Sequence, residues 1–398
     1  MVMSAEQKVH GLEGGSEAPD WPFLKLEEVD TVLRNYPGAR GAEHIVRFSP
    51  RPFSAAAVVA TPKGTVFVKR HHRSVRDREG ILEEHRLIAY LHGRGALVKP
   101  ALADDDGQTT MMQGKWIYEV HPLGMGIDVY VDALSWTPFQ TAAHARGAGL
   151  ALAHLHRAAA GYDAPRRQPR PLVAGFSIFS TDHPWPSLER YVRDRPALAA
   201  YLASRKWRQD FDELLMPLHT ALRSWLPYFR PLWTHNDFHA SNLLWNGGDP
   251  DATVSGIIDF GLADRTTAIY DLATAIERNA IEWLRLPDDS PDILHLDQVD
   301  ALLEGYEALC PLSYEEAHGL VALLPLVHVE FALSEVEYFF GILKSSPKAD
   351  LAYDGYALGH ARWFQGRNGR RLLEHLAAWA EGTRARQGQR EPCTETAS

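Results

Sequence analysis

A polar eight-residue loop followed by a tight hairpin is the feature that most limits how this chain can fold. Residues 235–242 read His-Asn-Asp-Phe-His-Ala-Ser-Asn, and Asp259 follows Asn242 by seventeen residues. Two short apolar runs lie between them on either side of an Asn-Gly-Gly turn, a pattern typical of a β-hairpin. A tight hairpin would bring Asn242 and Asp259 side by side and place Asp237 close to both.

This set of side chains suits phosphoryl transfer. That reaction needs a carboxylate that orients or deprotonates an attacking hydroxyl, oxygen ligands for Mg²⁺ and a cation that holds nucleotide phosphates. Asn242 and Asp259 would meet the requirement for two Mg²⁺ ligands, and Asp237 would face an acceptor. Two other interpretations remain open. The loop residues could cap their own backbone, or His235 and His239 could form a hydrolase metal triad with Asp237, although nothing nearby completes such a site.

The order of the flanking segments predicts two lobes. Up to about residue 119 the chain consists of short β-like runs with one helix, residues 80–95, among them. The expected strands cover residues 44–48, 55–61, 65–70 and two pieces within 111–120. Beyond residues 121–126 the pattern is mainly helical, and the hairpin is the exception.

We therefore expect an α+β fold in which a small β-rich lobe precedes a larger, mainly helical lobe. A cleft between two such lobes is where a ligand would bind. The predicted boundaries are a disordered N-terminal tail at 1–20, an N-lobe at 21–120, a C-lobe at 121–381 and a disordered C-terminal tail at 382–398.

Composition excludes several classes of protein. The formal net charge of −10 argues against a nucleic-acid binder, which needs a basic face. The two cysteines, Cys310 and Cys393, are too few for a disulfide framework and fit a reducing compartment. The longest apolar stretch, residues 320–333, is interrupted by polar residues and is shorter than the roughly 20 residues that span a bilayer. With no apolar signal core in the first twenty residues, we expect a cytoplasmic protein without a membrane partner.

Acidic residues are concentrated in the second half of the chain. Between Glu277 and Glu337 there are fourteen acidic residues and only two arginines, a local balance of −12. These residues could simply form the solvated outer faces of helices. They could also form an acidic wall that attracts a cationic substrate.

The loop and the strand-borne aspartate together resemble the aminoglycoside phosphotransferase and choline kinase-like families, which are relatives of the protein kinases. The resemblance rests on H-x-D-x-x-x-x-N at 235–242 and on I-I-D-F-G at 257–261, with further similar phrases at 152–156 and 270–273. The matches run from about residue 43 to about residue 285. The resemblance implies a two-lobed protein-kinase-like fold and an ATP- and Mg²⁺-dependent phosphotransferase that acts on the hydroxyl of a small molecule.

The resemblance also implies roles for individual residues. Asp237 would be the catalytic carboxylate, and Asn242 and Asp259 would bind Mg²⁺. Lys69, on the third expected strand, would contact the α- and β-phosphates, and Glu84 would pair with it from the helix. The neighbouring Glu83 is the rival partner but points about 100° away on the same helix.

Further roles follow less directly. Backbone groups from Tyr118 to Val120 would meet the adenine, and His235 would support the loop by hydrogen bonding. Asp271 opens a helical run, so it is expected to be an N-cap, and by the resemblance it could also brace the loop. Asp264 is expected to be a surface charge, and residues 166–171 are expected to form an exposed loop.

The acceptor is not determined by the sequence. The acidic stretch favours a cationic or zwitterionic molecule, such as an aminoglycoside, an amino alcohol or a hydroxylated amino acid. The sequence does not distinguish ATP from GTP as the phosphoryl donor, and it leaves the oligomeric state open. Residues 49–55 lack a glycine-rich pattern, so no residues there can be assigned to the phosphates. Two alternative functions remain: an atypical Ser/Thr protein kinase, and a nucleotide-binding regulatory protein without turnover.

Overall fold

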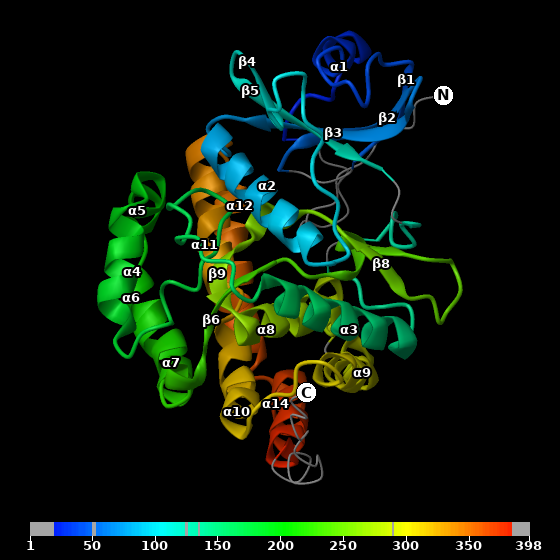
Figure 1. The fold of residues 1–398 in the computed structure, drawn as a ribbon. Coiled ribbons are helices and arrows are strands. Elements are labelled where there is room, and N and C mark those ends of the chain that lie inside the picture. The colour runs from blue at the N-terminus through cyan, green and yellow to red at the C-terminus, as the bar shows by residue number, and fades with distance from the viewer. Residues whose placement is uncertain (1–19, 50–52, 124–125, 134–135, 289, 384–398) are drawn as a thin grey trace.

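The computed structural model describes residues 20–49, 53–123, 126–133, 136–288 and 290–383. The expected tails at 1–20 and 382–398 lie almost entirely outside these ranges. The described chain forms a small lobe built on a β-sheet and a larger helical lobe (Figure 1). The predicted two-lobed α+β fold is therefore confirmed.

The N-lobe is a five-stranded antiparallel sheet with the strand order β1-β2-β3-β5-β4. All the strands expected here and the helix that follows the third of them are present, with ends that differ by a few residues. The elements are α1 (Leu26–Leu33), β1 (His44–Phe48), β2 (Ala55–Thr61), β3 (Gly64–His72), α2 (Arg78–Gly93), β4 (Thr110–Gln113) and β5 (Trp116–Pro122).

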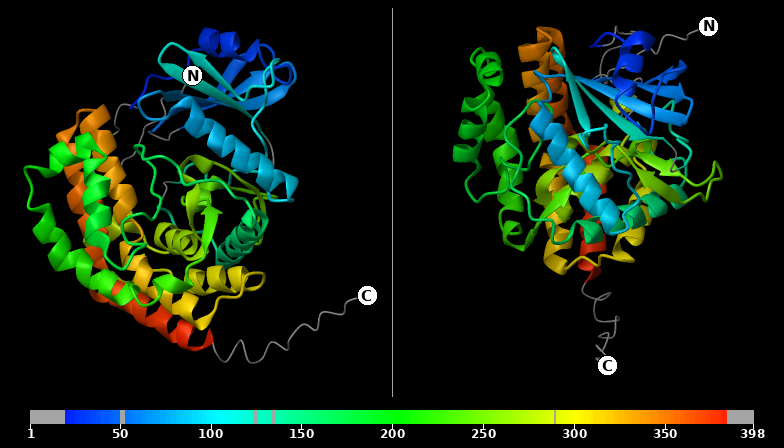
Figure 2. Two further views of the ribbon diagram at one scale, coloured as in Figure 1. Left: turned by 60° about the vertical axis from the view of Figure 1, so that its left-hand side comes forward. Right: turned by 45° about the horizontal axis from the view of Figure 1, so that its top comes forward.

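The two faces of the sheet have different partners. Because side chains alternate along a strand, Val66 and Val68 of β3 face α1 and pack in one core with Val29, whereas Phe67 and Lys69 face the opposite side. That opposite side is turned toward α2 and the C-lobe (Figures 1 and 2). The alternation places the Lys69 ammonium group in the space between the lobes.

The C-lobe surrounds one large core with helices and two small antiparallel strand pairs, β6 with β9 and β7 with β8. Figure 2 shows α4 to α7 along one side of this lobe, next to α11 and α12. The strands are β6 (Pro231–Thr234), β7 (Leu243–Trp245), β8 (Val254–Ile257) and β9 (Asp264–Thr267). The helices are α3 (Ala142–Ala159), α4 (Pro184–Arg193), α5 (Pro196–Leu202), α6 (Trp207–Asp210), α7 (Met216–Leu222), α8 (Ala268–Asn279), α9 (Leu296–Glu307), α10 (Tyr314–Leu323), α11 (Val329–Val336), α12 (Ser346–Asp350), α13 (His360–Trp363) and α14 (Arg367–Glu381).

Residues 320–333, the longest apolar stretch of the sequence, lie within one apolar helical run. Tyr314–Ile342 is a run of 29 residues, long and apolar enough by itself to cross a membrane. However, 89% of its most apolar window is buried inside the fold. The run therefore belongs to the core of the C-lobe, where its apolar side chains pack against neighbouring helices.

The acidic residues between 277 and 337 do not form one surface. Glu277, Glu330 and Glu335 are buried. Glu330 accepts hydrogen bonds from the backbone N–H groups of Gly175, Ser177 and Ile178 at 2.6–3.1 Å, so it holds a loop in place. Neither the solvated-face interpretation nor the acidic-wall interpretation describes these carboxylates.

Candidate active site

The loop between β6 and β7 is held by a buried aspartate from α8. Asp271 Oδ2 accepts a hydrogen bond from the His235 N–H at 2.9 Å, and Oδ1 accepts one from the Asn236 N–H at 2.8 Å. His156 Nε2 lies 3.0 Å from the same Oδ2. The N-cap of α8 is Thr267, so the interpretation of Asp271 as an N-cap is wrong. Asp271 is a brace for the loop, and it fixes the backbone that carries Asp237.

His235 ties the same loop to the end of the hairpin. Its Nε2–H donates to the carbonyl oxygen of Ile258 at 3.0 Å, and its Nδ1 accepts from the N–H of Asp237 at 3.2 Å. Both ring nitrogens are thus engaged with backbone groups. The side chain acts structurally, and the hydrolase triad with His239 is not assembled within the part of the chain described.

Asp237 lies in a ring of donors and positive charges. Asn242 Nδ2 donates to its backbone oxygen at 2.9 Å and lies 3.3 Å from its Oδ2. Arg278 Nη2 lies 3.5 Å from Oδ1, and His239 Nε2 lies 3.6 Å from Oδ2. Burial by itself would raise the pKa of Asp237, but the charges of His239 and Arg278 outweigh burial and lower that pKa. The carboxylate is therefore ionised and able to accept a proton or a hydrogen bond.

Asp259 pairs with Lys69 across the space between the lobes. Lys69 Nζ lies 2.8 Å from Asp259 Oδ1. Burial would raise the pKa of Asp259, but the Lys69 ammonium group lowers it to about 2. The backbone of Asp259 is in the left-handed region, with φ at 61°, a conformation that aspartate tolerates better than most residues. Asp259 lies two residues after the end of β8, and its carboxylate reaches Lys69 of β3.

The expected pair between Lys69 and Glu84 is wrong for this structure. Glu84 forms a close ion pair with Arg76 and lies 3.1 Å from Arg167 Nη1. Arg167 Nη1 also donates to the carbonyl oxygen of Gly261 at 3.1 Å. Glu84 is therefore bound by two buried guanidinium groups and not by Lys69. Through Arg167 it links α2 to the segment that follows Asp259.

One expectation for the neighbouring segments is wrong and another holds only in part. Residues 166, 168 and 169 are exposed in a loop, as expected, but Arg167 between them is buried. Asp264, expected on the surface, is buried and accepts hydrogen bonds from the N–H groups of Arg167 at 2.9 Å and Arg265 at 2.7 Å. Proline- and arginine-rich composition is typical of surface loops, and within 166–171 only Arg167 turns inward to the site.

The hairpin brings the two expected Mg²⁺ ligands to the same end of a strand pair. β7 and β8 pair Leu243 with Ile257, and the Ile258 N–H donates to the backbone oxygen of Asn242 at 3.0 Å. Asn242 and Asp259 both line the cavity between the lobes. An amide oxygen and a carboxylate are the hard oxygen donors that Mg²⁺ prefers, so the donor set fits this ion.

The cavity between the lobes has a volume of about 200 Å³. From the N-lobe it is lined by residues that include Phe67 and Lys69, and from the C-lobe by Asn242, Leu244 and Asp259. Both lobes contribute apolar and charged side chains to its lining. A mainly apolar cavity with a few placed polar groups is the usual form of a small-molecule site.

The adenine contacts expected from the backbone of Tyr118 to Val120 stay a prediction, and much of that backbone is paired within the sheet. Both side chains face away from the cavity into the core under α1, and the Tyr118 hydroxyl is hydrogen-bonded to Glu28. The backbone there is used by the sheet, and the Val120 oxygen accepts from the Leu102 N–H at 2.7 Å. The cavity wall is formed slightly later, by residues 121–123. The sheet extends to Pro122, further than the sequence pattern indicated.

Sequence reasoning missed three arginines at this site. Arg278 was detectable, because it lies seven residues after Asp271 and therefore on the same face of α8. Arg76 and Arg167 carried no such signal. Their importance comes from the burial of Glu84 between segments that are far apart in the chain.

Glu335 is a buried carboxyl close to these charges. Its side chain is 3% exposed, and its Oε2 has no hydrogen-bond partner within the described ranges. Burial raises its pKa to about 8, against the opposing effect of Arg278. The group is therefore protonated in the folded protein over a pH range in which the unfolded chain carries the carboxylate.

We expect Glu335→Gln to stabilise the protein more at pH 9 than at pH 5. Between pH 4.5 and about 8 the folded carboxyl retains a proton that the unfolded chain has released, so the wild-type protein loses stability as the pH rises through this window. Glutamine does not titrate. Calorimetric melting at both pH values should show the larger gain at pH 9, whereas the exposed Glu374→Gln control should show the same small change at both. An equal gain for Glu335→Gln at the two pH values would contradict the elevated pKa.

Comparison with known proteins agrees with this geometry. The model of the phosphotransferase enzyme family matches residues 49–312. A homoserine kinase from Chelativorans sp. is 32% identical over 313 residues, which cover 76% of this chain and 81% of that protein. A homoserine kinase from Beijerinckia indica subsp. indica is 31% identical over 220 residues, 53% of this chain. In that pair the chain spans only 58% of the relative's length.

Solved structures share the fold. Amicoumacin kinase hAmiN, solved in complex with AMP-PNP, Ca²⁺ and Ami, is 13% identical and superposes with a TM-score of 0.55. The match covers 89% of this chain and 94% of that one. A family match over most of the chain, together with a relative that is similar over most of its length, identifies the family: the chain belongs to the phosphotransferase enzyme family.

Proposed function

We propose that this phosphotransferase transfers the γ-phosphoryl group of ATP, with Mg²⁺, to a hydroxyl of a small amine-bearing molecule. The observation that carries the proposal is one connected polar cluster at the cavity between the lobes. Asp237 contacts Asn242, Asn242 shares a strand end with Asp259, and Asp259 pairs with Lys69. These four residues supply the carboxylate, the metal ligands and the phosphate-binding cation that the reaction needs.

Each residue has a distinct part in the mechanism. Asp237 accepts a hydrogen bond from the acceptor hydroxyl and takes its proton as the oxygen attacks the γ-phosphorus, while the bond to the β–γ bridging oxygen breaks and ADP leaves. Lys69 holds the phosphate oxygens, and Asn242 and Asp259 are the residues that would hold Mg²⁺. When bound, that ion neutralises charge on the phosphates. Positioning and charge stabilisation account for nearly all of the rate, because the transition state is loose.

A hydroxylated amino acid is the acceptor class that we favour. Both relatives compared above are named homoserine kinases. Homoserine carries a hydroxyl and an amine, as the predicted acceptor does. Close to Asp237 the C-lobe supplies the positive charge of Arg278, and the carboxylate of Glu277 lies beside that arginine. Charges of both signs suit a zwitterion better than a plain cation.

The test is a Mg²⁺-dependent nucleotide-consumption assay on the purified protein. The panel holds hydroxylated amino acids, amino alcohols, aminoglycosides and sugars, each with ATP and with GTP, and Asp237→Ala serves as the blank. We expect consumption with a hydroxylated amino acid that is absent from the blank. Nucleotide binding without acceptor-dependent consumption would contradict the proposal and favour a binding protein without turnover. Consumption that needs a protein acceptor would favour the atypical protein kinase.

A further inference from the structure

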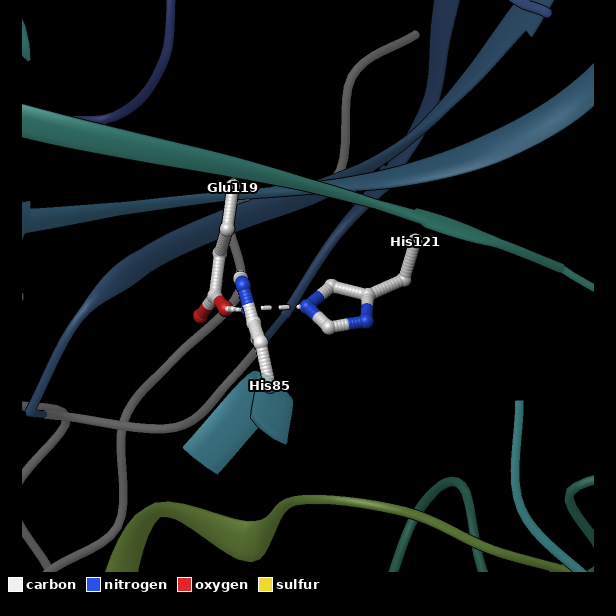
Figure 3. A group of neighbouring side chains, drawn as sticks. All are labelled: His85, Glu119 and His121. Carbon is white, nitrogen blue, oxygen red and sulfur yellow. Dashed lines mark hydrogen bonds and ion pairs between the residues drawn. The ribbon is translucent and has the colours of Figure 1, made fainter. Parts of the chain in front are cut away.

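A cluster of histidines surrounds one buried carboxylate in the N-lobe. Glu119 Oε2 lies 2.7 Å from His85 Nε2 and 3.0 Å from His121 Nε2. Figure 3 shows the two imidazole rings converging on the carboxylate, with His85 coming from α2 and the other two residues from β5. One donor atom from each residue lies within 4.8 Å of the other two. The proposed phosphoryl transfer uses none of these side chains.

A second layer of hydrogen bonds orients two of the three groups. The other carboxylate oxygen of Glu119, Oε1, lies 2.8 Å from His71 Nε2. The other ring nitrogen of His85, Nδ1, lies 2.7 Å from Thr109 Oγ1. Side chains that bind metals are typically held in this way, because a partner on the far atom fixes the tautomer and the direction of the donor.

Access distinguishes this cluster from a second one in the C-lobe. Glu277, His328 and His360 also group together, but all three are buried and Arg278 Nε lies 3.8 Å from Glu277 Oε2. In the N-lobe cluster the His121 side chain is 23% exposed, and Glu119 and His121 line the cavity between the lobes. The cavity would give an ion an entry path to the N-lobe cluster.

We propose that His85, Glu119 and His121 form a binding site for a first-row transition-metal ion such as Zn²⁺. Tetrahedral Zn²⁺ with bonds of about 2.0–2.2 Å places its donors roughly 3.4 Å apart. The carboxylate–imidazole separations of 2.7 and 3.0 Å would therefore each widen by less than about 1 Å. Two imidazole nitrogens and a carboxylate are ligands that suit Zn²⁺. Asn242 and Asp259 offer only oxygen atoms, which suit Mg²⁺ better. The nearby Lys69 ammonium group is paired with Asp259, which limits its repulsion of an ion.

The test is a calorimetric titration of the full chain with Zn²⁺ in buffer that contains excess Mg²⁺. The Mg²⁺ occupies sites made of oxygen alone, and we expect one Zn²⁺ to bind per chain. His121→Gln should lower the Zn²⁺ affinity at least about 10-fold. Loss of a residue that only supports a metal ligand already costs about that much, and His121 would be a ligand itself. Thermal melting of the metal-free variant verifies that it folds.

His295→Gln is the matched control. His295 Nε2 lies 2.9 Å from Glu282 Oε1 and its side chain is 28% exposed, so it resembles His121 in its carboxylate partner and its exposure. Among the described residues, no second histidine is paired with that carboxylate. It should keep the wild-type affinity. Equal Zn²⁺ affinity in His121→Gln and in the wild type would overturn the proposal and point to the C-lobe cluster.

A measurement on the wild-type chain needs no variant. The X-ray absorption spectrum of bound Zn²⁺ should show only nitrogen and oxygen ligands, with scattering from two imidazole rings. A sulfur ligand would contradict the site, because it would place the ion at a cysteine instead.

Discussion

Asp237→Ala is expected to lower kcat by about 10²–10⁴-fold, the usual contribution of a positioned acid–base group, while leaving nucleotide affinity nearly unchanged. In the proposed mechanism this carboxylate meets the acceptor hydroxyl, and its neighbours Arg278 and His239 keep it ionised. Its loss removes the group that orients the hydroxyl, but it leaves Lys69 and Asp259 in place. Steady-state kinetics with the acceptor found in the panel, together with a fluorescent nucleotide titration, measures both quantities.

The control for this variant is Asp251→Ala. Asp251 is exposed at the turn of the same hairpin, so its replacement changes the charge by the same amount outside the site. It should retain wild-type turnover. A wild-type kcat in Asp237→Ala would remove the residue from the mechanism, whereas an equal loss of nucleotide binding would mean that the substitution had disturbed the whole loop.

Asp259→Asn is expected to lower kcat/KM by about 10²–10³-fold and to raise the Mg²⁺ concentration needed for half-maximal rate. The substitution keeps the shape of the side chain and removes the charge that pairs with Lys69 and that, in the proposed mechanism, would hold Mg²⁺. Its effect should therefore depend on Mg²⁺, unlike that of Asp237→Ala. Initial rates measured across a Mg²⁺ series at fixed ATP separate the two variants.

Asp251→Asn serves as the control for this substitution, since it makes the same chemical change at an exposed position. A loss in Asp259→Asn that is identical at every Mg²⁺ concentration would show that the carboxylate acts through Lys69 alone. It would also contradict its role as a metal ligand.

The sequence by itself determined the elements and the central motif. The strands at 44–48, 55–61 and 65–70 and the 243–258 hairpin follow from side-chain alternation and turn chemistry, which are local properties of the chain. The same local pattern determined that Asn242 and Asp259 meet, because a short hairpin leaves few ways to pair its strands. The resemblance singled out Lys69, and the structure places its side chain at the cavity.

Only the tertiary structure decided which partners those residues have. Glu84 pairs with Arg76 and Arg167, and the latter comes from a segment about eighty residues away that composition assigned to the surface. Asp271 lies in α8 as a brace for the loop and does not begin that helix. The choice of partner for a buried charge depends on the distances between segments that are remote in sequence. Those distances are fixed by packing of the whole core, which no local pattern contains.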